Sequence, residues 1–181
     1  LSRLISTAVS TIPDSDYERV RMTKAGEGTP ASSRLINGLI LEKKLALERM
    51  PRKLMASKVS VMSCPLELEK SSVSAEIEIN SPEQYEEFIS SEEKYIEKLT
   101  LKAKNSGANV IFSAEGIDQR ILHSLADAGI FAMGNVESSI AEDIAKACGA
   151  KLCDHIDDIT ECLGDINSLV HHRLEGPEGV K

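Results

Sequence analysis

The sequence predicts an α/β domain on three observations. Residues 109–112 and 130–133 are short apolar runs with β-branched members, which is typical of strands buried on both faces. Residues 117–128 between them have apolar side chains at helical spacing, and Gly129 ends the helix because glycine adopts the left-handed conformation easily. A strand, a helix and a strand in close succession indicate a parallel strand pair with a right-handed crossover.

Composition limits the core and the partners. The chain has 181 residues, 41% hydrophobic but only 3% aromatic and without Trp, so we expect one domain, or a domain with an appendage, around an aliphatic core. The net charge of -8 argues against nucleic acid and anionic membranes as partners. We expect no membrane span and no secretory signal, and Leu1 in place of Met leads us to expect a piece of a longer protein.

Residues 1–34 are predicted to form a connector. Residues 1–12 have helical spacing and end before Pro13, and residues 17–22 alternate as a short strand would. Residues 25–33 are rich in Gly, Pro, Ser and Thr, which is typical of a loop.

Two strands are predicted next. Residues 35–41 are apolar around Gly38, and residues 58–63 alternate between two faces. Pro51 interrupts the basic stretch between them and is expected to prevent a helix there.

Residues 65–105 differ in character from the segments before them. Residues 73–79 alternate as a half-exposed strand, and Ser81 with Pro82 is a strong helix start, because serine caps and proline fits the first helical position. Two adjacent serines at 90–91 favour a break in the following helix, because serine competes for backbone hydrogen bonds.

This segment holds nearly all of the net charge. From 66 to 98 the sequence has ten glutamates and three lysines, which gives -7 of the -8. Such a segment does not fit inside a core, so it projects into solvent or meets a partner. Pattern alone leaves two interpretations open: an ordinary amphipathic surface helix, or a protruding arm with an apolar tip.

The C-terminal part is predicted to complete the sheet. A helix over 136–148 ends at Gly149, a short strand follows at 151–153, and residues 154–165 form an acidic turn region. Residues 166–174 alternate loosely and are predicted to be the last strand.

The sequence shows no catalytic constellation, which favours a binding module over an enzyme. It lacks a phosphate-binding glycine loop and a nucleophile elbow. Cys153 with His155 and the histidines at 171–172 is a weak metal hypothesis, and the aspartates within 154–158 fit a solvated turn better than an acid/base pair. The cysteines are expected to be buried reduced thiols in a reducing cytoplasm: Cys64, Cys148, Cys153 and Cys162.

Several short pieces follow one another in an order found in a known family. The most specific stretch is 107–112 with 116–118. The other pieces are 35–38, 50–51, 77–79, 81–82, 92–93, 145–151, 158–160 and 163–164. Each piece is weak alone, but together they resemble the apical domain of group II chaperonins, the archaeal thermosome and its eukaryotic cytosolic relatives.

The resemblance implies a mixed sheet flanked by helices, with a protruding helical arm and a short N-terminal connector. Residues 1–34 would be a connector or intermediate-domain segment, 35–174 an apical substrate-binding domain with its helical protrusion at 65–104, and 175–181 a tail. The implied function is that of the substrate-binding and built-in-lid domain of an ATP-dependent chaperonin, which captures and encloses non-native proteins for folding.

The resemblance also implies which side chains touch client proteins. The helix at 117–128 would line the ring cavity, with the segment 45–50 beside it. The implied client-binding residues are Gln119, Arg120, His123, Ser124, Leu45, Leu47 and Met50, and the implied lid-tip residues are Tyr85, Phe88 and Ile89.

Two departures from the family indicate that the client-binding face differs in its side chains from that of typical members, or that this subunit is a divergent paralogue. Gly134 and Asn135 stand where the family usually carries basic residues, and residues 122–125 differ from its usual polar-aromatic helix face.

The resemblance implies no catalytic residue and no metal site in this chain. ATP and Mg²⁺ would serve the full-length family protein through an equatorial domain, whose motifs this sequence lacks. The implied partners are unfolded client proteins and neighbouring chaperonin subunits, with no nucleic acid and no membrane, and the implied location is cytoplasmic.

The sequence is also compatible, to different degrees, with two other functions. An unrelated α/β enzyme or small-molecule-binding domain would place its ligand at the carboxyl ends of 109–112 and 130–133, where the loop 113–116 offers only Glu115 as a charged group. A coiled-coil arm is disfavoured because the apolar stripe is too short.

Overall fold

The computed structural model describes residues 2–12, 20–23, 29–68 and 81–171. The chain divides into two compact units, of which the second spans residues 43–171 and holds the sheet. The described part of the first unit contains the helix α1 (Ser2–Thr11) and the short 3-10 helix η3 (Pro30–Ser32). The predicted N-terminal helix is therefore confirmed.

Two strand predictions in the first unit are wrong where the structure describes them. Residues 20–22 and 35–41 belong to no strand, and the apolar side chains of Leu35, Ile36 and Ile40 are exposed. An apolar run becomes a strand only when another strand satisfies its backbone groups, and no described segment pairs with these residues. The rest of 17–22, the predicted strand at 73–79 and the tail at 175–181 lie outside the described residues.

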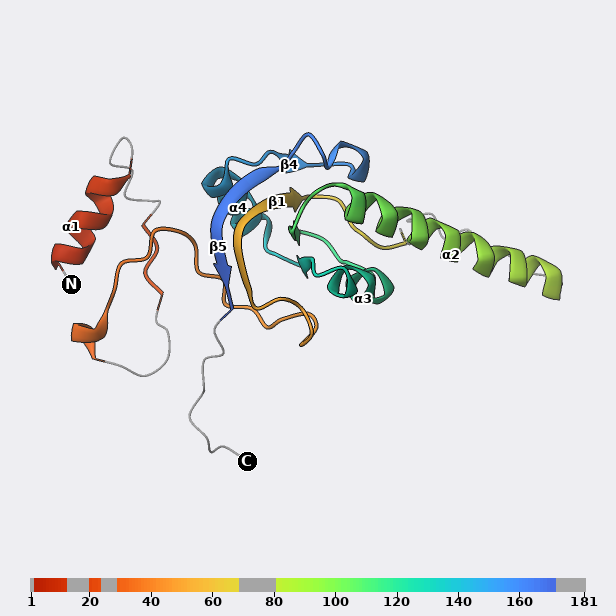
Figure 1. The fold of residues 1–181 in the computed structure, drawn as a ribbon, viewed down its shortest axis with the longest axis horizontal. Helices are drawn as coiled ribbons and strands as arrows, with labels where there is room; N and C mark the ends of the chain where they lie inside the picture. The colour runs from red at the N-terminus through yellow and green to blue at the C-terminus, as the bar shows by residue number, and fades with distance from the viewer. Residues whose placement is uncertain (1, 13–19, 24–28, 69–80, 172–181) are drawn as a thin grey trace, which may run out of the picture. The chain divides into compact units, whose positions relative to one another are not determined.

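A mixed sheet organises the second unit (Figure 1). The central strand β1 (Lys53–Met62) pairs in parallel with β2 (Val110–Ser113), which pairs in parallel with β3 (Phe131–Met133). On its other side, β1 pairs in parallel with β4 (Leu152–Cys153) and antiparallel with β5 (Gly164–Val170). The predicted parallel strand pair and the mixed sheet are confirmed, although β1 begins five residues before the predicted start at 58.

Helices cover this sheet. The helix α3 (Gln119–Asp127) packs on β3 and on the long helix α2 (Pro82–Asn105), whereas α4 (Ser138–Cys148) packs on β1 and β5. The 3-10 helix η4 (Ile156–Asp158) packs beside α2. Among the helices in the described part of the chain, none combines the length and the apolar character needed to cross a bilayer.

The core is aliphatic, as the composition predicts. Val59, Val110, Ile111 and Ile121 have no exposed surface. Among the described residues, one edge-on aromatic contact is found, with the ring centroids of Phe112 and Phe131 5.9 Å apart. All four residues of β2 are buried.

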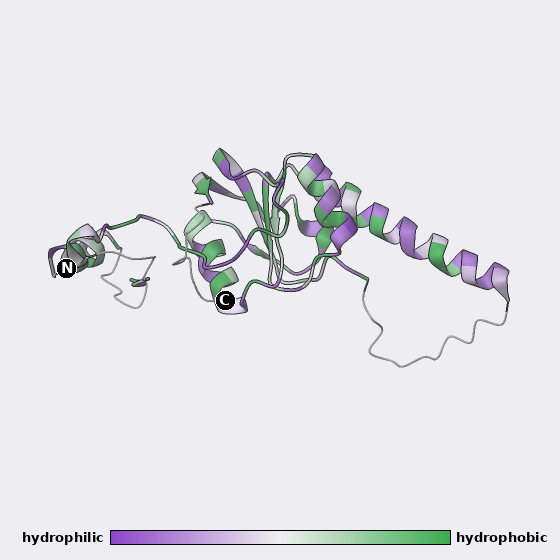
Figure 2. Cartoon of the chain, turned by 90° about the horizontal axis from the view of Figure 1, so that it is seen from below, coloured by the Kyte–Doolittle hydropathy of each residue, from purple (hydrophilic) through white to green (hydrophobic). Residues whose placement is uncertain are grey.

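The arm is one continuous helix from Pro82 to Asn105, whereas Leu66 near its start is buried and bridges to Ile117. The Ser81 hydroxyl accepts a hydrogen bond from the Gln84 amide at 3.3 Å, which confirms the predicted cap. The predicted break at 90–91 is wrong, because the Ser91 hydroxyl donates to the Glu87 carbonyl at 2.8 Å and so bonds within the helix. Figure 2 shows hydrophobic and hydrophilic residues alternating along the whole of α2.

Two glycines illustrate different constraints around α4. Gly149 ends α4 in the left-handed conformation, with φ at 65° and open space where a Cβ would stand. At Gly164, which begins β5, a Cβ would lie 2.5 Å from the Cys148 carbonyl oxygen and 2.7 Å from the Ala150 nitrogen. The close approach of β5 to the end of α4 therefore requires glycine.

We expect Gly164→Ala to lower the free energy of unfolding by about 2 kcal/mol, because backbone atoms must shift to admit the methyl group. The matched control is Gly149→Asn, which should stay within about 1 kcal/mol of the parent because asparagine tolerates the left-handed conformation. Urea unfolding followed by circular dichroism measures both, and equal losses would contradict this packing constraint.

Candidate functional site

The outer face of α3 is polar and open, while its inner face is part of the core. Ile121 and Leu125 are fully buried. Gln119, Arg120 and His123 are exposed, and Ser124 is half-buried. The helix is thus held rigidly from behind and presents polar side chains outward, as the sequence predicts for this segment.

An ion pair fixes the start of α3. Asp118 caps the helix by accepting from the Arg120 amide at 2.7 Å. The Arg120 side chain also donates two hydrogen bonds to the Asp118 carboxylate, at 3.1 and 3.0 Å. These side-chain bonds hold the pKa of Asp118 below its usual range. Arg120 is therefore presented in a defined orientation, close enough to Glu92 and Glu93 of α2 for both carboxylates to raise its pKa further.

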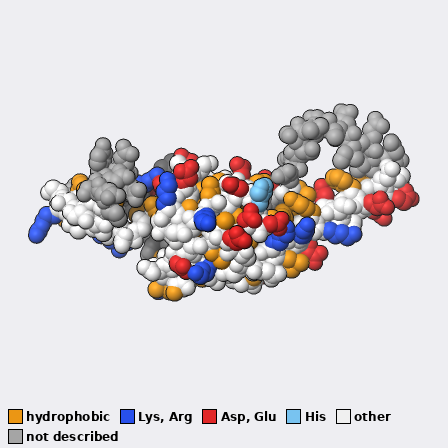
Figure 3. Space-filling view, turned by 90° about the horizontal axis from the view of Figure 1, so that it is seen from above, with side chains coloured by type: hydrophobic (Ala, Val, Ile, Leu, Met, Phe, Trp, Pro, Cys, Tyr) orange, Lys and Arg blue, Asp and Glu red, His pale blue; other side chains and the backbone are white. Residues whose placement is uncertain are grey.

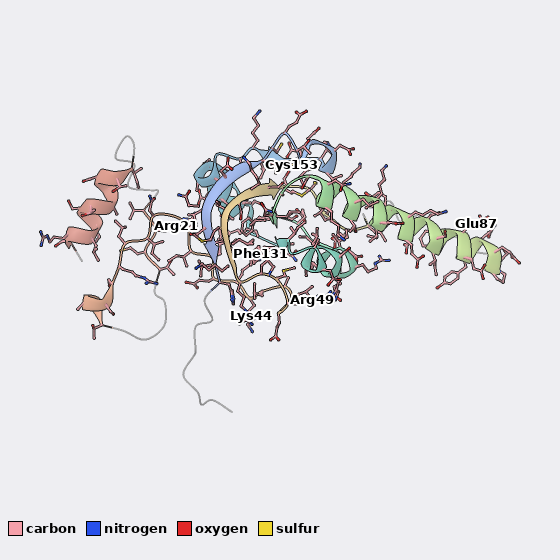
Figure 4. The ribbon with its side chains drawn as sticks, viewed as in Figure 1. Arg21, Lys44, Arg49, Glu87, Phe131 and Cys153 are labelled. Atoms are coloured by element: carbon pink, nitrogen blue, oxygen red, sulfur yellow. The ribbon has the colours of Figure 1, made fainter. Side chains whose placement is uncertain are left out.

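The segment 43–50 lies beside α3, held there by Arg49 (Figure 4). The Arg49 guanidinium lies 2.5 Å from His123 Nδ1 and donates to the His123 carbonyl at 3.2 Å. A guanidinium only donates, so Nδ1 of His123 accepts. Arg49 also forms an ion pair with Asp127 at 3.0 Å, so one arginine contacts α3 at its middle and at its C-terminal end.

Lys43 holds the other end of the segment 43–50 against the turn after β3. Its ammonium donates to the backbone carbonyl of Asn135 and lies 3.5 Å from that of Gly134. Asn135 has a positive φ of 54°, which asparagine tolerates, and a Cβ on Gly134 would lie 3.1 Å from the Ile117 side chain. The tight turn after β3 therefore favours these two residues, and it presents carbonyl oxygens to Lys43.

A hollow of about 240 Å³ lies between the segment 43–46, the start of α3 and this turn. Ile117, Leu122 and Met133 supply apolar surface, and Lys43 and Lys44 supply positive charge at the same place. This hollow is smaller than the roughly 300–1,000 Å³ typical of small-molecule sites.

The outer half of α2, defined as residues 82–93, carries an exposed apolar group. Tyr85, Phe88 and Ile89 are 54%, 39% and 36% exposed. On the inner half, residues 94–105, the same stripe continues as Ile96, Leu99 and Ala103, which are buried. The apolar stripe is thus covered along only half of the helix.

The structure brings most of the predicted client-binding residues together. Leu45 and Leu47 are half-buried in the segment beside α3. Met50 is only 2% exposed, so it packs in the core and has no surface to offer a client. The predicted lid-tip residues lie on another part of the unit, in the outer half of α2.

Sequence reasoning missed Arg49 and Lys43. Both belong to a basic stretch whose partners are distant in the chain, so spacing offered no signal for their contacts.

The weak metal hypothesis receives no support. Among the residues that the structure describes, no three His, Cys, Asp or Glu side chains gather closely enough to hold a metal ion. The Cys153 thiol donates to the His155 carbonyl at 2.9 Å, and burial, together with the neighbouring Cys162 and Cys64 thiols, raises the pKa of Cys153 to about 12. Cys153 is therefore a packed thiol.

The ends of the parallel strands are likewise occupied by structural contacts. The Ser113 hydroxyl at the end of β2 donates to the Cys64 carbonyl at 3.1 Å and accepts from the Glu115 amide at 3.2 Å. The Ser113 hydroxyl is therefore engaged within the fold.

Comparison with known proteins identifies the family. Residues 1–178 match the model of the TCP-1/cpn60 chaperonin family. The thermosome subunit alpha of Archaeoglobus fulgidus is 34% identical over 98% of this chain, and a thermosome subunit beta of Desulfurococcus mucosus is 36% identical over 90% of it. The chain spans about a third of the length of these curated relatives, 34% and 32% respectively.

A solved structure agrees with this assignment. The open-state monomer of a group II chaperonin from Methanococcoides burtonii superposes with a TM-score of 0.62 and 29% identity, covering 80% of this chain and 30% of that one. Family match, relatives and structural neighbour all cover most of the chain, which therefore belongs to the TCP-1/cpn60 chaperonin family, in its group II branch.

Proposed function

We propose that this chain supplies the substrate-binding and lid part of a group II chaperonin, which captures and encloses non-native proteins. The observation that carries the proposal is the rigid α3 with an open polar outer face, flanked by the half-buried leucines at 45 and 47. The compact unit 43–171 would be the body of an apical domain spanning 35–174, with residues 65–104 as its protrusion and residues 1–34 as a connector.

The chemistry of this face suits clients without a fixed shape. An unfolded polypeptide exposes apolar and charged groups in no set arrangement, so a mixed surface contacts many sequences weakly. Gln119, Arg120, His123 and Ser124 supply hydrogen bonds and charge, and Leu45, Leu47 and the hollow beside them supply apolar contact. Weak contacts permit release, and several copies in a ring would add avidity.

The outer half of α2 would serve as the lid. Its exposed Tyr85, Phe88 and Ile89 offer an apolar surface on an otherwise acidic helix. The acidic side chains keep the open form soluble, and the apolar side chains gain burial against a client or a neighbouring subunit. Neighbouring chaperonin subunits and unfolded clients are thus the proposed partners, in the cytoplasm.

Nucleotide chemistry would lie outside the described residues. Thermosome relatives are about three times as long as this chain, and we propose that the full-length protein is an ATPase that uses Mg²⁺.

We expect the chain to suppress aggregation of a chemically unfolded client without nucleotide, and Phe88→Ser/Ile89→Ser to raise the concentration for half-suppression about tenfold, because apolar burial is lost. Light scattering measures the aggregation of the client at each concentration of the chain. The matched control is Met55→Ser/Val170→Ser, which removes two exposed apolar side chains from the β1–β5 pair.

Equal losses in these two double variants would show that general surface hydrophobicity, and no defined lid surface, holds the client. Absence of suppression by the parent chain, both free and displayed as a multivalent array, would overturn the proposed function.

We expect Arg49→Gln to weaken client binding about twofold to fivefold, because the segment 43–50 loses its ion pair with Asp127 and its hydrogen bond to the His123 carbonyl. Fluorescence anisotropy of a labelled unfolded client measures affinity, and amide exchange at residues 44–49 should rise in parallel. Lys146→Gln, which removes the exposed pair with Glu142 on α4, should change neither quantity.

A further inference from the structure

Charge is divided along α2 in a way that client capture does not explain. The outer half has five glutamates and no basic residue, whereas the inner half has four lysines and one glutamate. Figure 3 shows acidic side chains at the outer end of α2 and basic ones between them and the body of the unit.

Four of these charges share one face. Each residue of an α-helix turns by about 100°, so Glu83, Glu87, Lys94 and Lys98 fall within about 60° of one another around the axis. Ser90 and Ser91 lie between the acidic pair and the basic pair. We call these six residues the charged face of α2. It points away from the apolar stripe that contains Phe88 and Leu99.

The charged face is exposed in the described part of the chain, although Lys98 lies close enough to Asp157 to affect its pKa. Its four charged side chains are exposed, and no ion pair is found for them among the described residues. About one turn further along, Lys102 is already engaged, because it pairs with Asp157 of η4. The pKa of Asp157 is lowered chiefly by Lys102, with a smaller effect of Lys98.

The inner end of this face opens into a hollow of about 600 Å³ between α2 and η4. Leu101, Ile156 and Thr160 line it, and Leu101 is 51% exposed. Lys94 and Lys98 line this hollow too, so the charged face borders η4 at its inner end.

The helix itself gains little from this arrangement. Acidic residues favour a helix N-terminus and basic residues a C-terminus, but that effect is confined to the first and last turns, and Glu87 and Lys94 lie in the middle. Like charges four residues apart repel, both between Glu83 and Glu87 and between Lys94 and Lys98. Opposite charge from outside the helix would offset this repulsion.

We propose that α2 pairs antiparallel with α2 of a second copy of this chain through the charged face. A two-fold axis between Ser90 and Ser91 sets Glu83 of each copy opposite Lys98 of the other, and Glu87 opposite Lys94. Four ion pairs form between the copies. The small serines lie at the crossing and allow the two helices to approach closely.

The second copy is favoured over other occupants by this self-complementary order, since the same helix supplies both halves of every pair. The bodies of the two copies lie at opposite ends of the helix pair and do not compete for space. The contact is mostly polar, so it is weak and sensitive to salt. It does not rest on the proposed client capture, because it uses the opposite side of α2 from Tyr85, Phe88 and Ile89.

The test is sedimentation velocity of the 181-residue chain over a range of concentrations at low and high salt. The parent should self-associate at low salt, with a dissociation constant at least about tenfold higher at high salt. Glu83→Lys/Glu87→Lys and Lys94→Glu/Lys98→Glu should each lose self-association, because every facing pair becomes repulsive. An equimolar mixture of these two variants should associate again, because every pair is then opposite in charge.

Lys146→Glu/Lys151→Glu changes the net charge as much as the second variant but lies elsewhere, and it should behave as the parent. Circular dichroism verifies that each variant keeps its helix content. Three results would overturn the proposal: no association of the parent at low salt, association that persists in both charge-inverted variants, or no association in their mixture. Persistence would indicate the apolar stripe as the contact.

Discussion

The exposed apolar surface of this unit arises because the apolar stripe of α2 packs against the rest of the unit along only half of its length. Ile96, Leu99 and Ala103 are buried against the rest of the unit, and each large side chain of this kind contributes about 1.5–3 kcal/mol when fully buried. The stripe continues outward through Tyr85, Phe88 and Ile89, which are exposed. A continuous 24-residue helix therefore carries apolar surface away from the core, and the side chains of its far half are mostly exposed.

The helix α3 is also held by buried side chains on one face, but its exposed face is polar. Ile121 and Leu125 lock the helix from behind, so the outer face can remain polar without loss of order. Arg49 and Lys43 then hold the segment 43–50 beside it through side-chain and backbone contacts. Individual surface ion pairs contribute little to stability. Here they hold the segment 43–50 beside α3, where we propose that clients bind.

Local signals predicted much of the fold, and distant contacts account for what they missed. The Ser81 cap, the strand at β2 and the helix end at Gly149 depend on neighbouring residues, and all were predicted correctly. The strand at 35–41 was wrong because pairing depends on a partner strand, and the break at 90–91 was wrong because Ser91 bonds back to Glu87. The contacts of Arg49 join residues 74 or more positions apart, and Met50 is buried by tertiary packing, so no sequence spacing revealed either.

Amide hydrogen exchange along α2 tests most directly whether a half-anchored helix presents a binding surface. We expect slow exchange at residues 96–105 and fast exchange at 84–92 in the chain alone, because helical stability here comes from packing. Addition of a chemically unfolded client should slow exchange at 84–92 and at the outer face of α3. Uniform protection of α2 without client, or client-induced protection confined to other elements, would contradict this assignment.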